Sequence, residues 1–109
     1  MKDDRLYLIH ISECIERIES YIKGKNKKDF INSPLIQDAV VRNLQILAES
    51  TQRLSDEFKE RESEIDWFEL AGFRNVLVHD YLGLDIERVW NILVKDLPTL
   101  KIAIQRMLE

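Results

Sequence analysis

The sequence of 109 residues has one cysteine, two prolines and three glycines. A single cysteine excludes an internal disulfide, and Cys14, at helical spacing between Ile11 and Ile15, is typical of a small core residue rather than a nucleophile or metal ligand. The scarcity of glycine and proline, with 45% apolar and 33% charged residues, favours an ordered helical protein. A chain that needs no disulfide suits a reducing cytoplasm, where we expect this protein to reside.

Long apolar runs are also absent. The N-terminal stretch "MKDDRLYLIHISEC" has a six-residue apolar segment that His10 interrupts. Such a segment is too short and too polar for a signal peptide or a membrane span, so we expect neither.

The sequence also lacks a net positive charge and the paired histidines or cysteines of a metal site. The net charge of -4 argues against broad electrostatic binding to nucleic acid, so that any contact with RNA must use a local patch. His10 and His79 fall in different predicted helices without a paired histidine or cysteine spacing, and the carboxylates are scattered. We therefore predict no metal site and no cofactor.

Helical periodicity is present along most of the chain. Apolar residues recur at steps of three and four over residues 4–23, from Pro34 to about residue 60, from Asp66 through "WFELAGFRNVLVHDY", and after Asp85 to the end. Ser33 and Asp85 are predicted N-caps, the lysine-rich "GKNKKDFINS" is a predicted surface loop, and Pro98 should kink or split the last helix. We predict one all-α domain over residues 1–109, a four- to five-helix up-and-down bundle, whose small size favours a dimer.

One stripe of the second predicted helix is unusual because charged residues stand in line with apolar ones. The stripe consists of Leu35, Ala39, Arg42, Ile46 and Glu49. Ordinary helical ion pairs at i,i+4, Asp38 with Arg42 and Glu49 with Arg53, account for these charges. Alternatively, the stripe lines a polar cleft.

The third predicted helix carries a histidine on the side opposite its core face. A step of about 100° per residue puts Phe73 and Leu77 toward the core, and it puts Phe68, Gly72, Asn75 and His79 on the other side. Glycine in mid-helix is tolerated where another backbone comes close, so this side predicts a subunit contact near Gly72. Alternatively, Gly72 only relieves crowding within one bundle.

Arg74 and His79 are candidate catalytic residues. A guanidinium can stabilise charge on a phosphorane, and an imidazole can move protons for the attacking and leaving oxygens of a phosphodiester. Their spacing of five does not place them on one stripe, so arginine must reach around the helix or across a dimer. The alternative is an ordinary helix-end histidine and a solvated arginine.

The longer string "RNVLVHDY" matches the Arg-x4-His-x-Tyr signature of the HEPN superfamily, in its HepT-type branch. "DAVVRNLQILAES" and "RNVLVHDYLGLDIERVWNILVKDLPTL" also resemble that family's second, third and fourth helices. The resemblance implies a HEPN-like homodimer with metal-independent endoribonuclease activity, in which Arg74 and His79 line a shared cleft. We expect Asn75 to orient His79, and Arg42 and Glu49 to border the cleft.

The resemblance also implies a toxin–antitoxin pair. HepT-type toxins are typically paired with an MntA-type nucleotidyltransferase antitoxin that adenylylates the tyrosine of the signature, here Tyr81. A bulky, anionic adenylate beside the cleft would repel an RNA phosphate. One alternative is that Tyr81 only packs the helix end. Another is that the chain is a non-catalytic helical module that binds a nucleotidyltransferase or a nucleotide.

Overall fold

The protein, represented by a computed structural model, is described over residues 4–68, residue 70 and residues 85–109. All regular structure within these residues is helical, which confirms the predicted all-α class. The elements are α1 (Asp4–Ile22), α2 (Lys27–Ile31), α3 (Pro34–Gln52), α4 (Asp56–Arg61), α6 (Ile86–Asn91), a π-helical segment η2 (Ile92–Asp96) and α7 (Leu97–Leu108). None of the helices in these ranges is long and apolar enough to cross a membrane.

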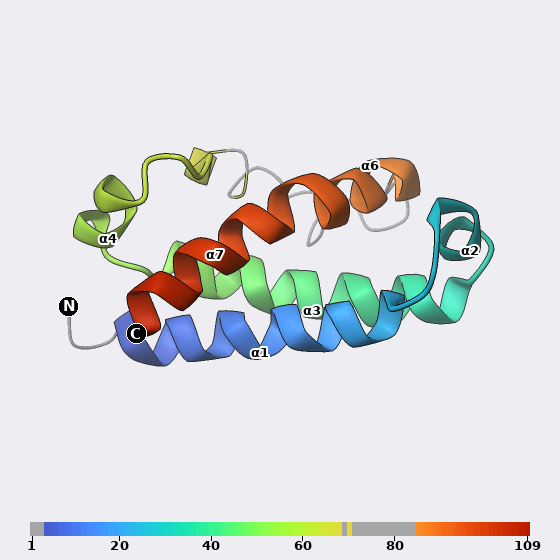
Figure 1. Ribbon diagram of the computed structural model, residues 1–109, viewed down its shortest axis with the longest axis horizontal. Helices are drawn as coiled ribbons and strands as arrows, with labels where there is room; N and C mark the ends of the chain where they lie inside the picture. The colour runs from blue at the N-terminus through green and yellow to red at the C-terminus, as the bar shows by residue number, and fades with distance from the viewer. Residues whose placement is uncertain (1–3, 69, 71–84) are drawn as a thin grey trace.

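The two 19-residue helices α1 and α3 lie side by side and run in opposite directions, and α7 packs against α1 (Figure 1). α2 contacts α6 at one end of the bundle, and α4 lies at the other end (Figure 1). The core between these helices is aliphatic with two phenylalanines, and its fully buried side chains include Ile11, Ile15, Ile18, Phe30, Val40, Leu47, Phe58, Val89 and Ile104.

The first helix has the predicted position. It ends at Ile22 and is followed by a turn at Gly24, whose φ of 73° is the left-handed conformation that glycine adopts most readily. The amide of Lys25 donates to the carbonyl oxygen of Ile22 at 2.9 Å. The loop predicted after it is wrong in part, because residues 27–31 form α2. Asn26 and Asp29 each accept a hydrogen bond from the other's backbone amide, and Phe30 is fully buried.

The second predicted helix begins as expected but ends earlier. The hydroxyl of Ser33 accepts a hydrogen bond from the Ile36 amide, with Pro34 at the first helical position. The helix stops at Gln52, not near residue 60, because Ser55 caps a new helix, α4, by accepting a hydrogen bond from the Phe58 amide. The apolar spacing continues across this break, which explains why periodicity alone predicted one helix.

The C-terminal helix is interrupted, as the position of Pro98 in the sequence predicts. Asp85 caps α6 by accepting hydrogen bonds from the amides of Glu87 and Arg88. A proline cannot donate to the carbonyl four residues earlier, and the helix widens into η2 before α7 starts at Leu97.

Candidate functional site

Four of the six predicted site residues, Arg74, Asn75, His79 and Tyr81, lie outside the described residues. Their roles therefore stay predictions. The other two, Arg42 and Glu49, are both in α3, and the described elements show how the chain enters and leaves the segment that contains the motif.

Arg42 and Glu49 lie along one hollow on the surface of α3. The hollow has a volume of about 260 Å³, and its lining in the described residues is Arg42, Gln45, Ile46 and Glu49. These positions follow steps of three, one and three, which is one face of a helix. Arg42 is exposed and the other three are half-buried, whereas Val40 and Leu44 on the opposite side enter the core. α3 thus presents a polar, concave face, as a cleft-lining stripe requires.

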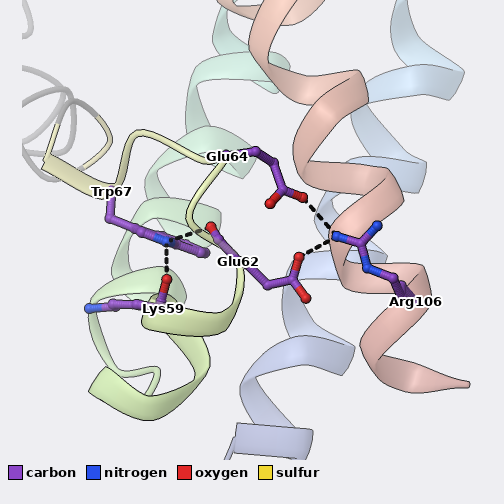
Figure 2. A network of polar contacts seen from close by, with 5 residues as sticks. All are labelled: Lys59, Glu62, Glu64, Trp67 and Arg106. Atoms are coloured by element: carbon purple, nitrogen blue, oxygen red, sulfur yellow. Dashed lines mark hydrogen bonds and ion pairs between the residues drawn. The ribbon is translucent and has the colours of Figure 1, made fainter.

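Trp67 anchors the chain just before the segment that contains the motif. Its indole Nε1 donates to the carbonyl oxygens of Lys59 at 3.1 Å and Glu62 at 3.2 Å (Figure 2). Its ring packs edge-on against buried Phe58, with ring centroids 5.8 Å apart. Residues 67 and 68 are already helical, so these contacts set where the helix begins seven residues before Arg74.

Glu62 and Glu64 connect the same turn to α7. One guanidinium nitrogen of Arg106, Nη2, donates to carboxylate oxygens of both residues, at 2.7 Å for Glu64 (Figure 2). The Glu62 side chain is only 5% exposed, so Arg106 balances a charge that would otherwise be buried alone. The hydrogen bond from its own backbone amide, followed by that from Arg106, lowers the pKa of Glu64, and the two carboxylates raise the pKa of Arg106.

Phe68, the residue after Trp67, has the opposite environment. Its side chain is 90% exposed although it lies beside the anchored Trp67. Phe68 belongs to the helix side on which the sequence predicts a subunit contact. A large exposed aromatic ring is typical of a surface that a partner covers.

A second cavity lies between α3, residues 64–70 and the C-terminal helices, with a volume of about 130 Å³. Its described lining is mainly apolar, with Glu64, Asp66, Asp96 and Thr99 as polar members; the apolar members are Leu44, Leu47, Ala48, Ile65, Leu70, Ile92, Leu97 and Leu100. No group of three or more histidine, cysteine or acidic side chains that could hold a metal ion occurs in the part of the chain that the structure describes.

Sequence reasoning missed the polar contacts that support this region. Besides the Glu62–Arg106 pair, buried Asp4 accepts hydrogen bonds from both the amide and the hydroxyl of Ser55. The signal for α4 was available, since a serine followed by Asp56 and Glu57 is a usual helix start. The partners themselves are far apart in the chain, and no local spacing indicates them.

Residues 11–107 match the family described as Ribonuclease HepT-like. A protein of Methanocaldococcus jannaschii, "Gamma-glutamylcyclotransferase and putative RNase MJ0434", is 42% identical over 108 residues, covering 99% of this chain and 49% of its own. This chain thus spans about half the length of that relative. "Putative RNase TTE0752" of Caldanaerobacter subterraneus subsp. tengcongensis is 35% identical over 109 residues, 100% of this chain and 97% of its own.

"Probable ribonuclease HepT" of Thermococcus cleftensis is 37% identical over 95 residues, 87% of this chain and 86% of its own. No solved structure matches the chain significantly. The family match covers most of the sequence and includes the segment "RNVLVHDY". The predicted HepT branch of the HEPN superfamily is therefore confirmed, and the chain belongs to the HepT-like ribonuclease family.

Proposed function

We propose that the protein is a metal-independent endoribonuclease in which Arg74 and His79 cleave RNA in a cleft formed by two copies of the chain. The observation that carries this proposal is the intact "RNVLVHDY" motif in a chain that belongs to a ribonuclease family. Relatives whose names include RNase or ribonuclease match 87% to 100% of the chain, which supports the same chemistry.

The reaction uses a nucleophile that RNA itself supplies. His79 takes the proton of a 2′-hydroxyl, whose oxygen attacks the adjacent phosphorus and forms a 2′,3′-cyclic phosphate. The bond from phosphorus to the 5′-oxygen breaks, and the histidine of the second copy gives that oxygen a proton. Arg74 stabilises the negative charge on the phosphorane. Atoms and charge balance without a metal ion.

A second copy is part of the proposal for a geometric reason. On the helix that the sequence predicts here, five positions turn by about 500°, which would put Arg74 and His79 of one chain on different stripes. A twofold axis beside this helix brings two such pairs together. The exposed ring of Phe68 supports a contact on this side. Asn75 then orients His79, and Arg42 and Glu49 border the cleft from α3.

The deciding experiment compares His79→Ala with His10→Ala, since His10 is the other histidine and is exposed on α1. We expect the parent and His10→Ala to cut a labelled single-stranded RNA in the presence of a chelator, and His79→Ala to lose cleavage while keeping its circular dichroism and its dimeric mass. Equal cleavage by both variants, or loss of parental activity with the chelator, would overturn the proposal.

We further propose that a nucleotidyltransferase antitoxin neutralises the protein by adenylylating Tyr81. The phenol lies two residues after His79, so an adenylate there adds bulk and negative charge beside the RNA phosphate. After incubation with the partner and ATP, intact-mass analysis should show an adenylylated parent and Tyr21→Phe control, and an unmodified Tyr81→Phe variant. An unmodified parent would contradict this part of the proposal.

The acidic balance of the chain favours one alternative, a non-catalytic module that binds the nucleotidyltransferase or a nucleotide. In that case the partner would bind tightly, and neither the parent nor any variant would cut RNA.

A further inference from the structure

The charge of this acidic protein is unevenly distributed along its length. Residues 23–32, "KGKNKKDFIN", carry four lysines against one aspartate, a net charge of +3 in a chain whose total is -4. Residues 53–66, which include α4, carry a net charge of -3. These segments lie at opposite ends of the 41 Å long axis (Figure 1). The segment at one end of the bundle is thus cationic, and the segment at the other end stays anionic even with Arg106 of α7, which pairs with Glu62 and Glu64.

The cationic end, defined here as Lys23, Lys25, Lys27 and Lys28, is open to solvent. All four lysines are exposed. Among the ion pairs of the described residues only Lys27 takes part, with its Nζ 3.4 Å from Glu87 of α6. The other three ammonium groups remain available to a ligand.

The nearest acidic residue in the sequence does not neutralise this cluster by pairing with it. The carboxylate of Asp29 accepts a hydrogen bond from the backbone amide of Asn26 at 3.0 Å, as half of the capping box of α2. The turn at Gly24 is also uncrowded, since a Cβ added there would meet nothing within 4 Å. A ligand can therefore come close to the backbone at Gly24.

Chain connectivity limits how far the cationic end can lie from the motif. α2 packs beside α6, whose first turn Asp85 caps: the rings of Phe30 and Trp90 have centroids 5.4 Å apart, and Lys27 pairs with Glu87 at the surface. His79, the proposed catalytic histidine, lies six residues before Asp85. Six residues of chain span at most about 21 Å, so a single-stranded RNA of several nucleotides that is cut at His79 can extend to the lysines.

We propose that the cationic end is a docking surface for the phosphates of single-stranded RNA beside the cleavage site, an inference that rests on the proposed ribonuclease function. It resolves the conflict between an anionic protein and a polyanionic substrate, because binding of phosphates at the lysines releases counterions locally. The anionic α4 end repels the strand and so favours entry from the α2 end.

The test uses the triple variant Lys23→Gln/Lys25→Gln/Lys28→Gln, which keeps Lys27 and its pair with Glu87. Binding of a fluorescent single-stranded oligoribonucleotide is measured by anisotropy at several salt concentrations, in the His79→Ala background. Each phosphate contact on a single strand contributes about 0.7 to the salt slope, so the slope should fall by about 2, with affinity reduced at least ~10-fold at low salt. In the active background, KM should rise similarly while kcat stays unchanged.

The matched control, Arg17→Gln/Arg61→Gln/Lys95→Gln, removes the same charge at exposed positions elsewhere on the surface. It should retain most of the parent's affinity and salt slope. An unchanged salt slope in the lysine variant, or an equal loss in the control, would overturn the docking surface. If the parent binds RNA through the lysines but does not cut it, the proposed ribonuclease function fails and the docking surface stands.

Discussion

Asp4 and Ser55 join the start of α1 to the start of α4 across 51 residues of sequence. Two hydrogen bonds link them: the Ser55 hydroxyl donates to the carboxylate of Asp4 at 2.6 Å, and the Ser55 amide donates to it at 2.9 Å. Ser55 also caps α4, so this contact lies where the chain turns after α3. It fixes the direction in which α4 leads to Trp67 and the motif segment.

Asp4→Ala should lower the free energy of unfolding at neutral pH. A buried hydrogen bond to a charged group contributes roughly 1.5–3 kcal/mol, and here two such bonds share one carboxylate, so we expect a loss in that range. Urea unfolding measures it. Glu13→Ala, at an exposed position of α1, is the control and should change stability little. Equal stabilities of the two variants would contradict this role of Asp4.

The stabilisation by Asp4 should disappear in acid. Burial by itself would raise the pKa of this carboxyl, but the hydrogen bonds from the Ser55 hydroxyl and amide outweigh burial and hold the pKa below its ordinary 3.8. A group with a lowered pKa in the folded state stabilises the protein fully above its unfolded pKa, and this contribution is lost as pH falls through the folded value. The stability difference between the parent and Asp4→Asn should therefore be constant above about pH 5 and shrink below about pH 4. A difference that does not change in acid would disprove the prediction.

Glu62 and Glu64 contact the same nitrogen of Arg106 but should differ in importance. Glu62 is buried and Glu64 is exposed. Glu62→Ala removes a charged hydrogen bond inside the protein and should cost roughly 2 kcal/mol. Glu64→Ala removes a solvent-exposed pair, which water largely replaces, and should have little effect. Thermal unfolding of both variants compares the two losses of stability. A larger loss in Glu64→Ala than in Glu62→Ala would show that the buried carboxylate does not stabilise the turn at residues 62–64.

Trp67→Phe should weaken the anchoring of the chain just before the segment that contains the motif. It keeps a ring against Phe58 but removes the indole donor that satisfies the carbonyl oxygens of Lys59 and Glu62, at a cost of about 1 kcal/mol. If this anchor positions the segment that contains Arg74, kcat for RNA should fall at temperatures where the protein is still folded. Trp90→Phe, which alters a ring packed at a tilt against Phe30 at the other end of the bundle, is the control and should leave kcat unchanged. Equal kcat values for the two variants would exclude the positioning role.

The start signals of helices were predictable because they are local. Ser33 with Pro34, and Asp85, were identified from the sequence and cap α3 and α6 as predicted. The end of α3 was not predicted, because Leu54 and Phe58 continue the apolar spacing across a break that the distant Asp4 helps to stabilise. Phe30 was assigned to a loop for a similar reason: five helical residues are too few to show a period, but tertiary burial of one ring suffices to hold them.

For the candidate site, the family could be predicted from the sequence but the supporting contacts could not. The family followed from a contiguous motif that begins at Arg74, and the family match confirms it. The supporting contacts of Glu62 with Arg106 join residues 44 positions apart, and neither side chain has a neighbour in sequence that reveals the pairing. The roles of Arg42 and Glu49 depend on what faces α3 in the assembled protein, which periodicity cannot supply.

Arg42 and Glu49 should affect RNA affinity in opposite directions if both border the cleft. They line the same hollow of α3, where an arginine attracts a phosphate and a glutamate repels it. A charged contact with a phosphate is worth roughly 1.5 kcal/mol, so Arg42→Gln should raise KM about 10-fold, and Glu49→Gln should lower it by a smaller factor. The double variant should lie between them. The kcat of Arg42→Gln should stay near that of the parent, because Arg42 positions RNA and does not transfer protons. If neither substitution changes KM, the hollow is not part of the RNA-binding cleft, and the charges of this stripe only form ion pairs within α3.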